Sequence, residues 1–181
     1  KILFSQDSFG MHLAVDKLFA DENDFCVLEQ EMRKYYANIL LPYSAQVEKL
    51  LADFPGFGLD VAVIAPDHGP VWRGELLAKP FEFYKKWSGQ KPENRAVVVY
   101  DTMWHSTEMM AAAIVDGLRA GGTGVKQIST AARPRSEVIT DILCAGALIV
   151  GSPTINIQMY PVVADVLCYI KGLRPNNLVG A

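Results

Sequence analysis

The chain has 181 residues, of which 50% are hydrophobic, so it can bury a substantial core and is too apolar to be disordered. Its 17 basic and 20 acidic residues give a net charge of -3 without a dense Lys/Arg cluster, which argues against binding to nucleic acid or an anionic membrane. No apolar run approaches the roughly 20 residues of a membrane span, and the first residues lack a signal peptide pattern. We expect a cytoplasmic protein whose partners are small molecules and other proteins.

The cysteines exclude several kinds of site. Cys26, Cys144 and Cys168 are an odd number without a C-x-x-C spacing. This pattern argues against a disulfide framework, a zinc site and a rubredoxin-type iron centre. We therefore expect free thiols, as in a reducing cytosol.

The first half of the chain predicts a strand, a helical region and a second strand. Residues 2–4 (Ile-Leu-Phe) are typical of a buried strand, and residues 29–53 have helical apolar spacing that Pro42 breaks or restarts. Residues 60–65 form a short apolar strand that runs into a turn rich in Pro and Gly. His68 therefore lies on a loop at the exit of a strand.

A domain boundary is expected near residue 90. Residues 79–87 carry Phe83 and Trp87 at helical spacing, and the polar segment 88–94 that follows them has the character of a linker. We expect one domain over residues 1–90 and a second over residues 95–181.

Strands and helices alternate after this boundary. Apolar strands are predicted over residues 95–100, 125–128, 147–151 and 178–181, and helices over residues 108–120, 136–144 (capped by Ser136) and 161–172. Unbroken apolar strands between helices of this kind indicate a doubly wound parallel sheet that helices cover on both faces. Ligands of such sheets bind at the carboxyl ends of the strands, which directs attention to loops 101–107 and 152–160.

The loop from Thr102 to Thr107 has the composition of a phosphate site. It places hydroxyls and successive backbone N–H groups at the start of a helix, where unpaired donors and the helix dipole favour an anion. The alternative is an ordinary helix cap, with Thr107 at the N-cap and Glu108 in the first turn. The loop alone does not decide between these interpretations.

The two loops together resemble those of the flavodoxin superfamily, and most closely those of the flavodiiron proteins, also called A-type flavoproteins or rubredoxin:oxygen oxidoreductases. The resemblance rests on Tyr100-Asp101-Thr102-Met103-Trp104 with Ser106-Thr107-Glu108, on Gly151-Ser152-Pro153-Thr154 with Asn156, and on Met159-Tyr160-Pro161. It implies an FMN site formed by Thr102, Met103, Trp104, His105, Ser106 and Thr107 at the phosphate and by Ser152, Pro153, Thr154, Ile155 and Asn156 beside the isoalloxazine ring.

Two aromatic residues of the first loop have open roles. His105 stands where simple flavodoxins usually have Gly, and it is either a tolerated loop side chain or a group that tunes the flavin. Trp104 either packs against the flavin or caps the surface.

The first half of the chain carries the rest of the resemblance. Asp7 and His68 match two ligand segments of the metallo-β-lactamase-like domain of flavodiiron proteins, and carboxylate and imidazole are suitable iron ligands. Alone, each residue is typical of a turn, and their order before a flavodoxin-like domain favours a diiron site. His12 and Asp67 are nearby candidates for orienting a ligand, or are ordinary turn residues. The apolar helix around Tyr35 indicates core or interface.

The resemblance implies an α/β chain: the C-terminal part of a metallo-β-lactamase-like αββα domain, followed by the N-terminal part of a flavodoxin-like doubly wound parallel sheet. Both ends are expected to lie inside a longer fold, with the other iron ligands before Lys1 and a third flavin loop after Ala181. The isolated chain is accordingly expected to be inactive and to bind FMN weakly or not at all.

The implied activity is that of an oxidoreductase. A reduced carrier such as rubredoxin, or a reductase, passes electrons through FMN to two non-haem Fe ions, which reduce O₂ to water or NO to N₂O. The resemblance also implies a head-to-tail homodimer in which each flavin serves the opposite subunit. The alternative is an FMN electron-transfer module fused to a metallo-hydrolase-like domain without a redox diiron site.

Overall fold

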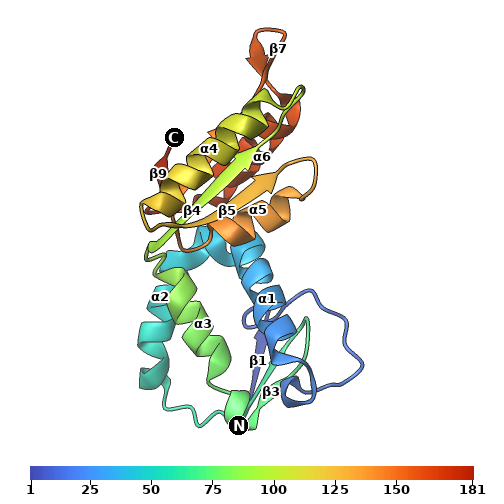
Figure 1. Cartoon of the computed structure of the whole chain (residues 1–181). Helices are drawn as coiled ribbons and strands as arrows, with labels where there is room; N and C mark the ends of the chain where they lie inside the picture. Colours follow the sequence, from blue (N-terminus) through green and yellow to red (C-terminus); the bar gives the residue numbers. More distant parts are fainter. The chain divides into compact units, whose positions relative to one another are not determined.

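The computed structural model describes residues 1–181 and divides into two compact units, residues 1–89 and 90–181. The first unit contains a small three-stranded sheet and three α-helices (Figure 1). Its sheet has the order β1-β2-β3, with β1 parallel to β2 and β2 antiparallel to β3. The elements are β1 Ile2–Gln6, α1 Phe25–Tyr35, α2 Ser44–Asp53, β2 Val63–Pro66, β3 Trp72–Arg73 and α3 Lys79–Ser88.

The helical region predicted over residues 29–53 is two helices joined by a distorted segment. Helix α1 begins at Phe25, four residues earlier than predicted, because the Asp24 side chain caps it by accepting from Cys26 N at 2.9 Å. A π-helical turn, Tyr36–Leu40, and a 3₁₀ turn, Leu41–Tyr43, then lead into α2. Pro42 lies in that 3₁₀ turn, so the predicted interruption at this residue is confirmed.

The prediction that residues 2–4 form a buried strand is wrong in its burial. The strand is present as β1, but Ile2 is 58% and Phe4 76% exposed. β1 is an edge strand paired only with β2, and its alternate side chains point to a face that no element of the chain covers.

Aromatic side chains form much of the core of the first unit and hold the segment after β1 in place. Phe9 is the centre of this arrangement: its N–H donates to Tyr84 Oη at 2.6 Å, and its carbonyl accepts from Trp72 Nε1 at 2.9 Å. Tyr36 packs edge-on against Tyr84, and Trp87 lies beside both rings. These contacts fix the loop that carries Asp7 against β3 and α3.

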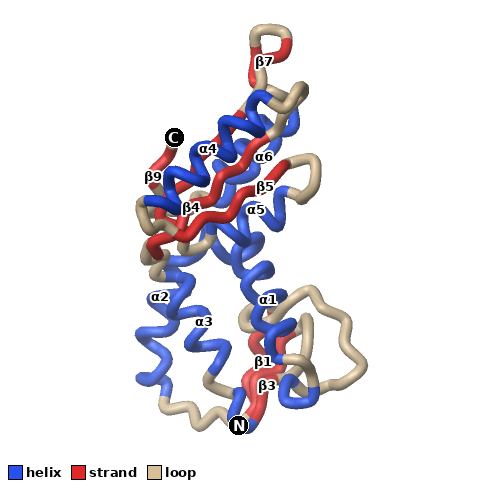
Figure 2. The backbone as a smooth tube through the Cα atoms, in the orientation of Figure 1, coloured by secondary structure: helices blue, strands red, loops and turns tan.

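The second unit is a parallel sheet with the strand order β5-β4-β6-β9. Helix α4 packs on one face, and the right-handed crossovers place α5 and α6 on the other (Figures 1 and 2). This is the doubly wound α/β arrangement predicted from the sequence. The elements are β4 Glu93–Tyr100, α4 Ser106–Ala120, β5 Gly124–Ser129, α5 Arg135–Ile142, β6 Ala145–Gly151, β7 Thr154–Ile155, β8 Gln158–Met159, α6 Pro161–Leu173 and β9 Val179–Gly180.

Ser136 does not cap a helix, contrary to the prediction. Helix α5 begins at Arg135 with Pro134 at its N-cap, and no side chain closes the first turn. Ser136 is inside the helix, where its carbonyl accepts from Thr140 Oγ1 at 2.7 Å. The helix ends at Ile142, before the predicted Cys144, because its C-cap residue Leu143 leaves the helical conformation with a ψ of 121° and Cys144 follows with a φ of 65°.

The C-terminal end of α6 offers a test of backbone strain. Arg174 is exposed and holds the left-handed cap position, with φ 53° and ψ 52°. Glycine adopts this conformation without the β-carbon penalty, so Arg174→Gly is expected to raise the free energy of unfolding by about 0.5 to 1 kcal/mol. Lys171→Gly, inside the helix, is the control and is expected to lower it by about 1 kcal/mol. Urea unfolding of the 181-residue chain measures both changes, and a destabilised Arg174→Gly would contradict the prediction.

Candidate functional site

The loop that follows β4 opens at the start of the longest helix of the chain. Helix α4 has 15 residues, and its N-cap is His105, which has a left-handed φ of 64° and makes no side-chain capping bond. The alternative prediction, Thr107 as the N-cap, is therefore wrong, since Thr107 lies within the first turn. The first N–H groups of α4 have no side-chain partner and are free to bind an anion.

Asp101 holds the loop after β4 in shape through its hydrogen bonds. Its carboxylate is 6% exposed; it accepts from Thr102 N at 2.7 Å and from the hydroxyl of Thr130, which follows β5. Thr130 N also donates to Tyr100 O at 2.9 Å. Asp101 thus ties the loop after β4 to the loop after β5. The sequence pattern includes Asp101 in the family resemblance but does not predict that it joins the two loops.

One buried hydroxyl in the loop lacks a partner. Thr102 Oγ1 is inaccessible to solvent and makes no hydrogen bond within the protein. A buried donor of this kind costs free energy unless something binds it, so its position beneath the loop is an observation in favour of a ligand.

The loop after β6 contains a small hairpin that the sequence did not reveal. Strands β7 and β8 pair through a two-residue turn in which Asn156 and Ile157 have φ values of 49° and 63°. Ser152 Oγ accepts from Tyr160 N at 2.9 Å and closes the base of the loop. Asn156 suits such a turn, but a β-branched Ile157 does not, which is why the pattern gave no hairpin signal. Ile157 is 92% exposed.

The two loops lie side by side, as the sequence predicted. β4 and β6 are neighbours with Tyr100 paired to Gly151, and Asp101 N donates to Gly151 O at 3.2 Å. A β-carbon on Gly151 would lie 3.0 Å from Thr107 Cγ2 and 3.2 Å from Tyr100 Cβ. The absence of a side chain at Gly151 therefore allows the first turn of α4 to approach the end of β6.

Apolar side chains at the tips of both loops face solvent. Trp104 is 84% exposed, while Met103 and Met159 are 38% and 49% exposed. Exposed apolar groups gathered on two adjacent loops are typical of a surface that a ligand or partner covers.

Charges in the first turn of α4 are coupled. His105 Nδ1 lies 2.7 Å from Glu108 Oε2, and Tyr100 Oη donates to Glu108 Oε1 at 3.3 Å. The hydrogen bond from His105 lowers the pKa of Glu108, and burial together with the charge of Glu108 raises the pKa of Tyr100. Glu108 is therefore a carboxylate, and Tyr100 a neutral donor, across the physiological range.

In the first unit, Asp7 and His68 lie together. They follow the neighbouring parallel strands β1 and β2, and His68 Nε2 is 3.4 Å from Asp7 Oδ1. Both side chains are substantially exposed, at 64% and 45%. Close backbone packing holds the loops: Met11 N donates to His68 O at 3.1 Å, and a β-carbon on Gly10 would lie 2.7 Å from that carbonyl oxygen.

Tyr35 and His12 surround this pair. The Tyr35 hydroxyl hydrogen bonds Asp7, and the ring of His12 lies edge-on to the rings of Tyr35 and His68, at centroid distances of 4.7 and 5.0 Å. Burial, with the neighbouring carboxylate of Asp7, raises the pKa of Tyr35 to about 12, so the phenol is neutral. Tyr35 is buried, as predicted from its apolar helix, but its contact with Asp7 was missed.

The structure brings two candidate metal ligands together in this place. No group of three or more His, Cys, Asp or Glu side chains suited to a metal occurs in the chain. Asp7 and His68 are therefore two neighbouring candidate ligands, and the chain groups no third side chain of these types with them. Asp67, the other neighbour considered from the sequence, acts on Tyr35 through its charge.

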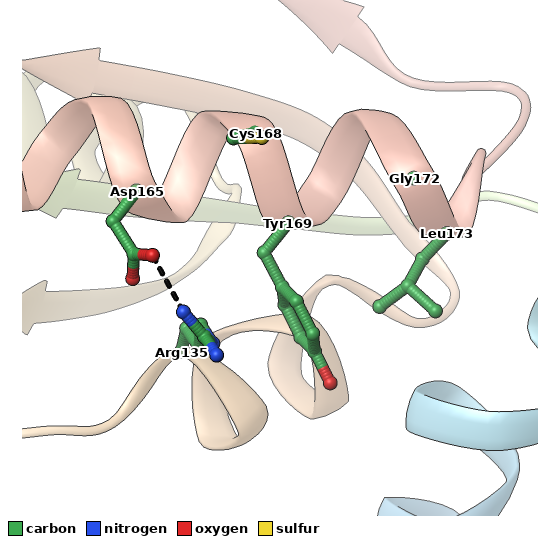
Figure 3. Close-up of a pocket in the computed structure, with 6 residues that line it drawn as sticks. All are labelled: Arg135, Asp165, Cys168, Tyr169, Gly172 and Leu173. Atoms are coloured by element: carbon green, nitrogen blue, oxygen red, sulfur yellow. Dashed lines mark hydrogen bonds and ion pairs between the residues drawn. The ribbon is translucent and has the colours of Figure 1, made fainter.

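A surface cavity of about 310 Å³ lies elsewhere in the second unit, along α6 (Figure 3). Arg135 lines this cavity. Its Nη1 donates to Asp165 Oδ1 at 2.5 Å, and its Cζ lies 4.9 Å from the centroid of the Tyr169 ring. The exposed Cys168 lines the same cavity, and none of Cys26, Cys144 and Cys168 forms a disulfide, as predicted. Helix residues form this cavity, so it is separate from the loops after β4 and β6.

None of the helices has the length and apolar character needed to cross a membrane.

Comparisons with known proteins agree with the fold and the paired loops. Residues 98–179 match the Flavodoxin family, which defines the second unit as a flavodoxin-like domain. A nitric oxide reductase of Moorella thermoacetica is 44% identical over 99% of the chain. Rubredoxin oxygen:oxidoreductase of Desulfovibrio gigas superposes with a TM-score of 0.96 at 42% identity over 99% of the chain, and the flavodiiron protein of Giardia intestinalis with 0.88 at 36% identity over 96%.

These likenesses cover both units, so the chain is similar to flavodiiron proteins along nearly its whole length. It spans 45% of the length of the Moorella and Desulfovibrio relatives and 42% of the Giardia protein. The recognition made from the loop motifs, and the α/β fold with a flavodoxin-like sheet, are confirmed.

Proposed function

We propose that the second unit binds FMN, with residues 102–107 around the phosphate and residues 152–156 beside the ring. FMN supplies one- and two-electron transfer when it is bound. The chain's own contributions are the unpaired N–H groups of α4, the partnerless hydroxyl of Thr102 and the close approach that Gly151 permits. Each suits a phosphate monoester at this helix N-terminus.

We propose that Asp7 and His68 are two of the ligands of a non-haem diiron centre in a metallo-β-lactamase-like domain spanning residues 1–90. Carboxylate and imidazole are appropriate donors for iron, and their atoms already lie 3.4 Å apart on adjacent loops. Two irons together supply a binding site and electrons for a small diatomic molecule.

Tyr35 is a positioning residue in this proposal. Its neutral phenol donates to Asp7 and so sets the orientation of the carboxylate, as residues behind metal ligands commonly do. His12 packs against Tyr35 and His68 and restricts both rings.

The activity supported best is the reduction of O₂ to water, with four electrons and four protons, or of two NO to N₂O and water, with two electrons and two protons. A reduced carrier, rubredoxin or a reductase, passes the electrons through FMN to the diiron site. The names of the Moorella and Desulfovibrio relatives favour these substrates and this donor. We also propose a cytoplasmic, head-to-tail homodimer in which each flavin serves the opposite subunit's irons. The observation that carries the proposal is the occurrence of the Asp7–His68 pair and the paired flavin loops in one chain.

The test uses the full-length protein that carries this segment. Iron and flavin are quantified, and the consumption of O₂ and of NO is followed with reduced rubredoxin. We expect two irons and one FMN per chain, with turnover of at least one substrate. Bound FMN without iron or consumption would instead support an electron-transfer module fused to a domain that lacks a redox diiron site.

A further inference from the structure

The first turn of α4 carries an ion pair beside the proposed phosphate seat, residues 102–107. His105 and Glu108 are both substantially exposed, at 80% and 44% of their side chains, yet their polar atoms lie 2.7 Å apart. Tyr100 occupies the second oxygen of Glu108. The carboxylate is therefore held at the start of the helix, where its negative charge would lie close to that of a phosphate bound at the helix N-terminus.

The backbone of His105 indicates that its side chain matters. Its φ of 64° is a conformation that glycine adopts freely and that disfavours residues with a β-carbon. Histidine at this position bears that cost and brings an imidazole to Glu108.

The other ionisable groups near the phosphate seat are either neutral or engaged with partners of their own. His105 is therefore the group whose charge can vary there. Asp101 is buried, with its oxygens turned to Thr102 N and Thr130, and Tyr100 is a neutral donor. The two arginines around the start of α5 are engaged elsewhere, Arg133 with Glu137 and Arg135 with Asp165, each at 2.5 Å. The lowered pKa of Glu108 keeps this carboxylate ionised from mildly acidic to alkaline pH.

We propose that His105 makes the phosphate seat sensitive to pH, so that the imidazolium cancels Glu108 and favours the flavin phosphate while the neutral imidazole leaves Glu108 to repel it. This inference rests on the proposed FMN site and adds its regulation. Histidine changes charge between about pH 5 and 8, so FMN binds more tightly at the acidic end of that range. A unit charge near a bound phosphate at the protein surface changes affinity by roughly three- to tenfold.

The test compares FMN and riboflavin binding to the apoprotein of the full-length flavoprotein at pH 5.5 and 8.5, by quenching of flavin fluorescence. The measured quantity is the ratio of the FMN dissociation constants of wild type and Glu108→Gln. We expect a ratio near one at pH 5.5 and roughly three to ten at pH 8.5. The phosphate also gains negative charge between these pH values and is then repelled more strongly by Glu108, and the same ratio measured in the His105→Gln background gives that contribution.

Three controls separate the charge effect from a structural one. Asp116→Asn removes an exposed carboxylate further along α4 and is expected to behave as wild type at both pH values. In the His105→Gln background no imidazolium cancels Glu108, so the corresponding ratio is expected to exceed one already at pH 5.5. Riboflavin lacks the phosphate, and its ratio is expected to stay near one.

FMN binding with the same wild-type to Glu108→Gln ratio at both pH values would overturn the inference and leave the proposed FMN site intact. A ratio that rises equally for riboflavin would also overturn it. Absence of FMN binding at every pH would overturn the proposed function, and this inference with it.

Discussion

Replacing Asp7 with asparagine in the full-length protein is expected to abolish iron loading and to lower the rate of O₂ or NO consumption by at least about 100-fold, while FMN stays bound. Asparagine has nearly the size of aspartate and still accepts a hydrogen bond from Tyr35. It lacks the negative charge that offsets two iron cations. The effect is therefore placed on the metal and not on the fold.

Asp67→Asn is the matched control for this experiment. Asp67 neighbours His68, its charge acts on Tyr35, and its backbone N–H donates to Gln6 O at 2.9 Å. Asparagine keeps that bond, so iron content and turnover are expected to stay within about threefold of wild type. Iron content in Asp7→Asn equal to that of wild type would show that Asp7 is no ligand.

Substitutions at His68 and Tyr35 are also expected to weaken iron binding, by different factors. His68→Ala removes a proposed ligand and is expected to resemble Asp7→Asn. Tyr35→Phe keeps the buried ring and removes its hydroxyl, which would weaken iron binding by about 10- to 100-fold. Iron titration of the apoprotein measures the change, and an unaltered iron affinity in Tyr35→Phe would contradict the positioning role.

The sheet of the second unit could be predicted because local and long-range signals agree there. Residues 96–100 are an unbroken apolar run, and their burial within β4 requires helices on both faces. Gly121 and Gly122 end α4 as predicted. The adjacency of loops 101–107 and 152–160 then follows from strand order alone.

Features that depend on tertiary contacts were harder to predict from the sequence. The turn between β7 and β8 contains Ile157, a residue type that is rare in turns. No local sequence preference therefore indicates this hairpin. Tyr35 has the pattern of an ordinary core residue, and its bond to Asp7 joins positions far apart in the sequence. Ile2 and Phe4 look buried because apolar residues usually are, while their actual exposure depends on what lies beside an edge strand. The FMN and iron roles of the site residues stay predictions.

Asp101→Ala is expected to loosen the phosphate seat and to weaken FMN binding by at least about tenfold. The substitution leaves two partly buried donors without their acceptor, the N–H of Thr102 and the hydroxyl of Thr130. An unsatisfied buried donor costs about 1 to 3 kcal/mol, so the second unit is also expected to lose about 2 to 3 kcal/mol in free energy of unfolding. Fluorescence titration with FMN and urea unfolding of the full-length apoprotein measure the two effects.

Asp101→Asn separates the geometry of the loop from its charge. The asparagine oxygen still accepts from Thr102 N, and its amide can donate to Thr130, whose hydroxyl then serves as acceptor. It also removes a negative charge from beneath a phosphate site, so FMN affinity is expected to equal or exceed that of wild type. Equal FMN affinities for Asp101→Ala and Asp101→Asn would contradict the prediction, because the hydrogen bonds of Asp101 would then contribute nothing to the seat. Rescue by asparagine would show that Asp101 acts by holding the loop in shape, although its charge opposes the anion bound above it.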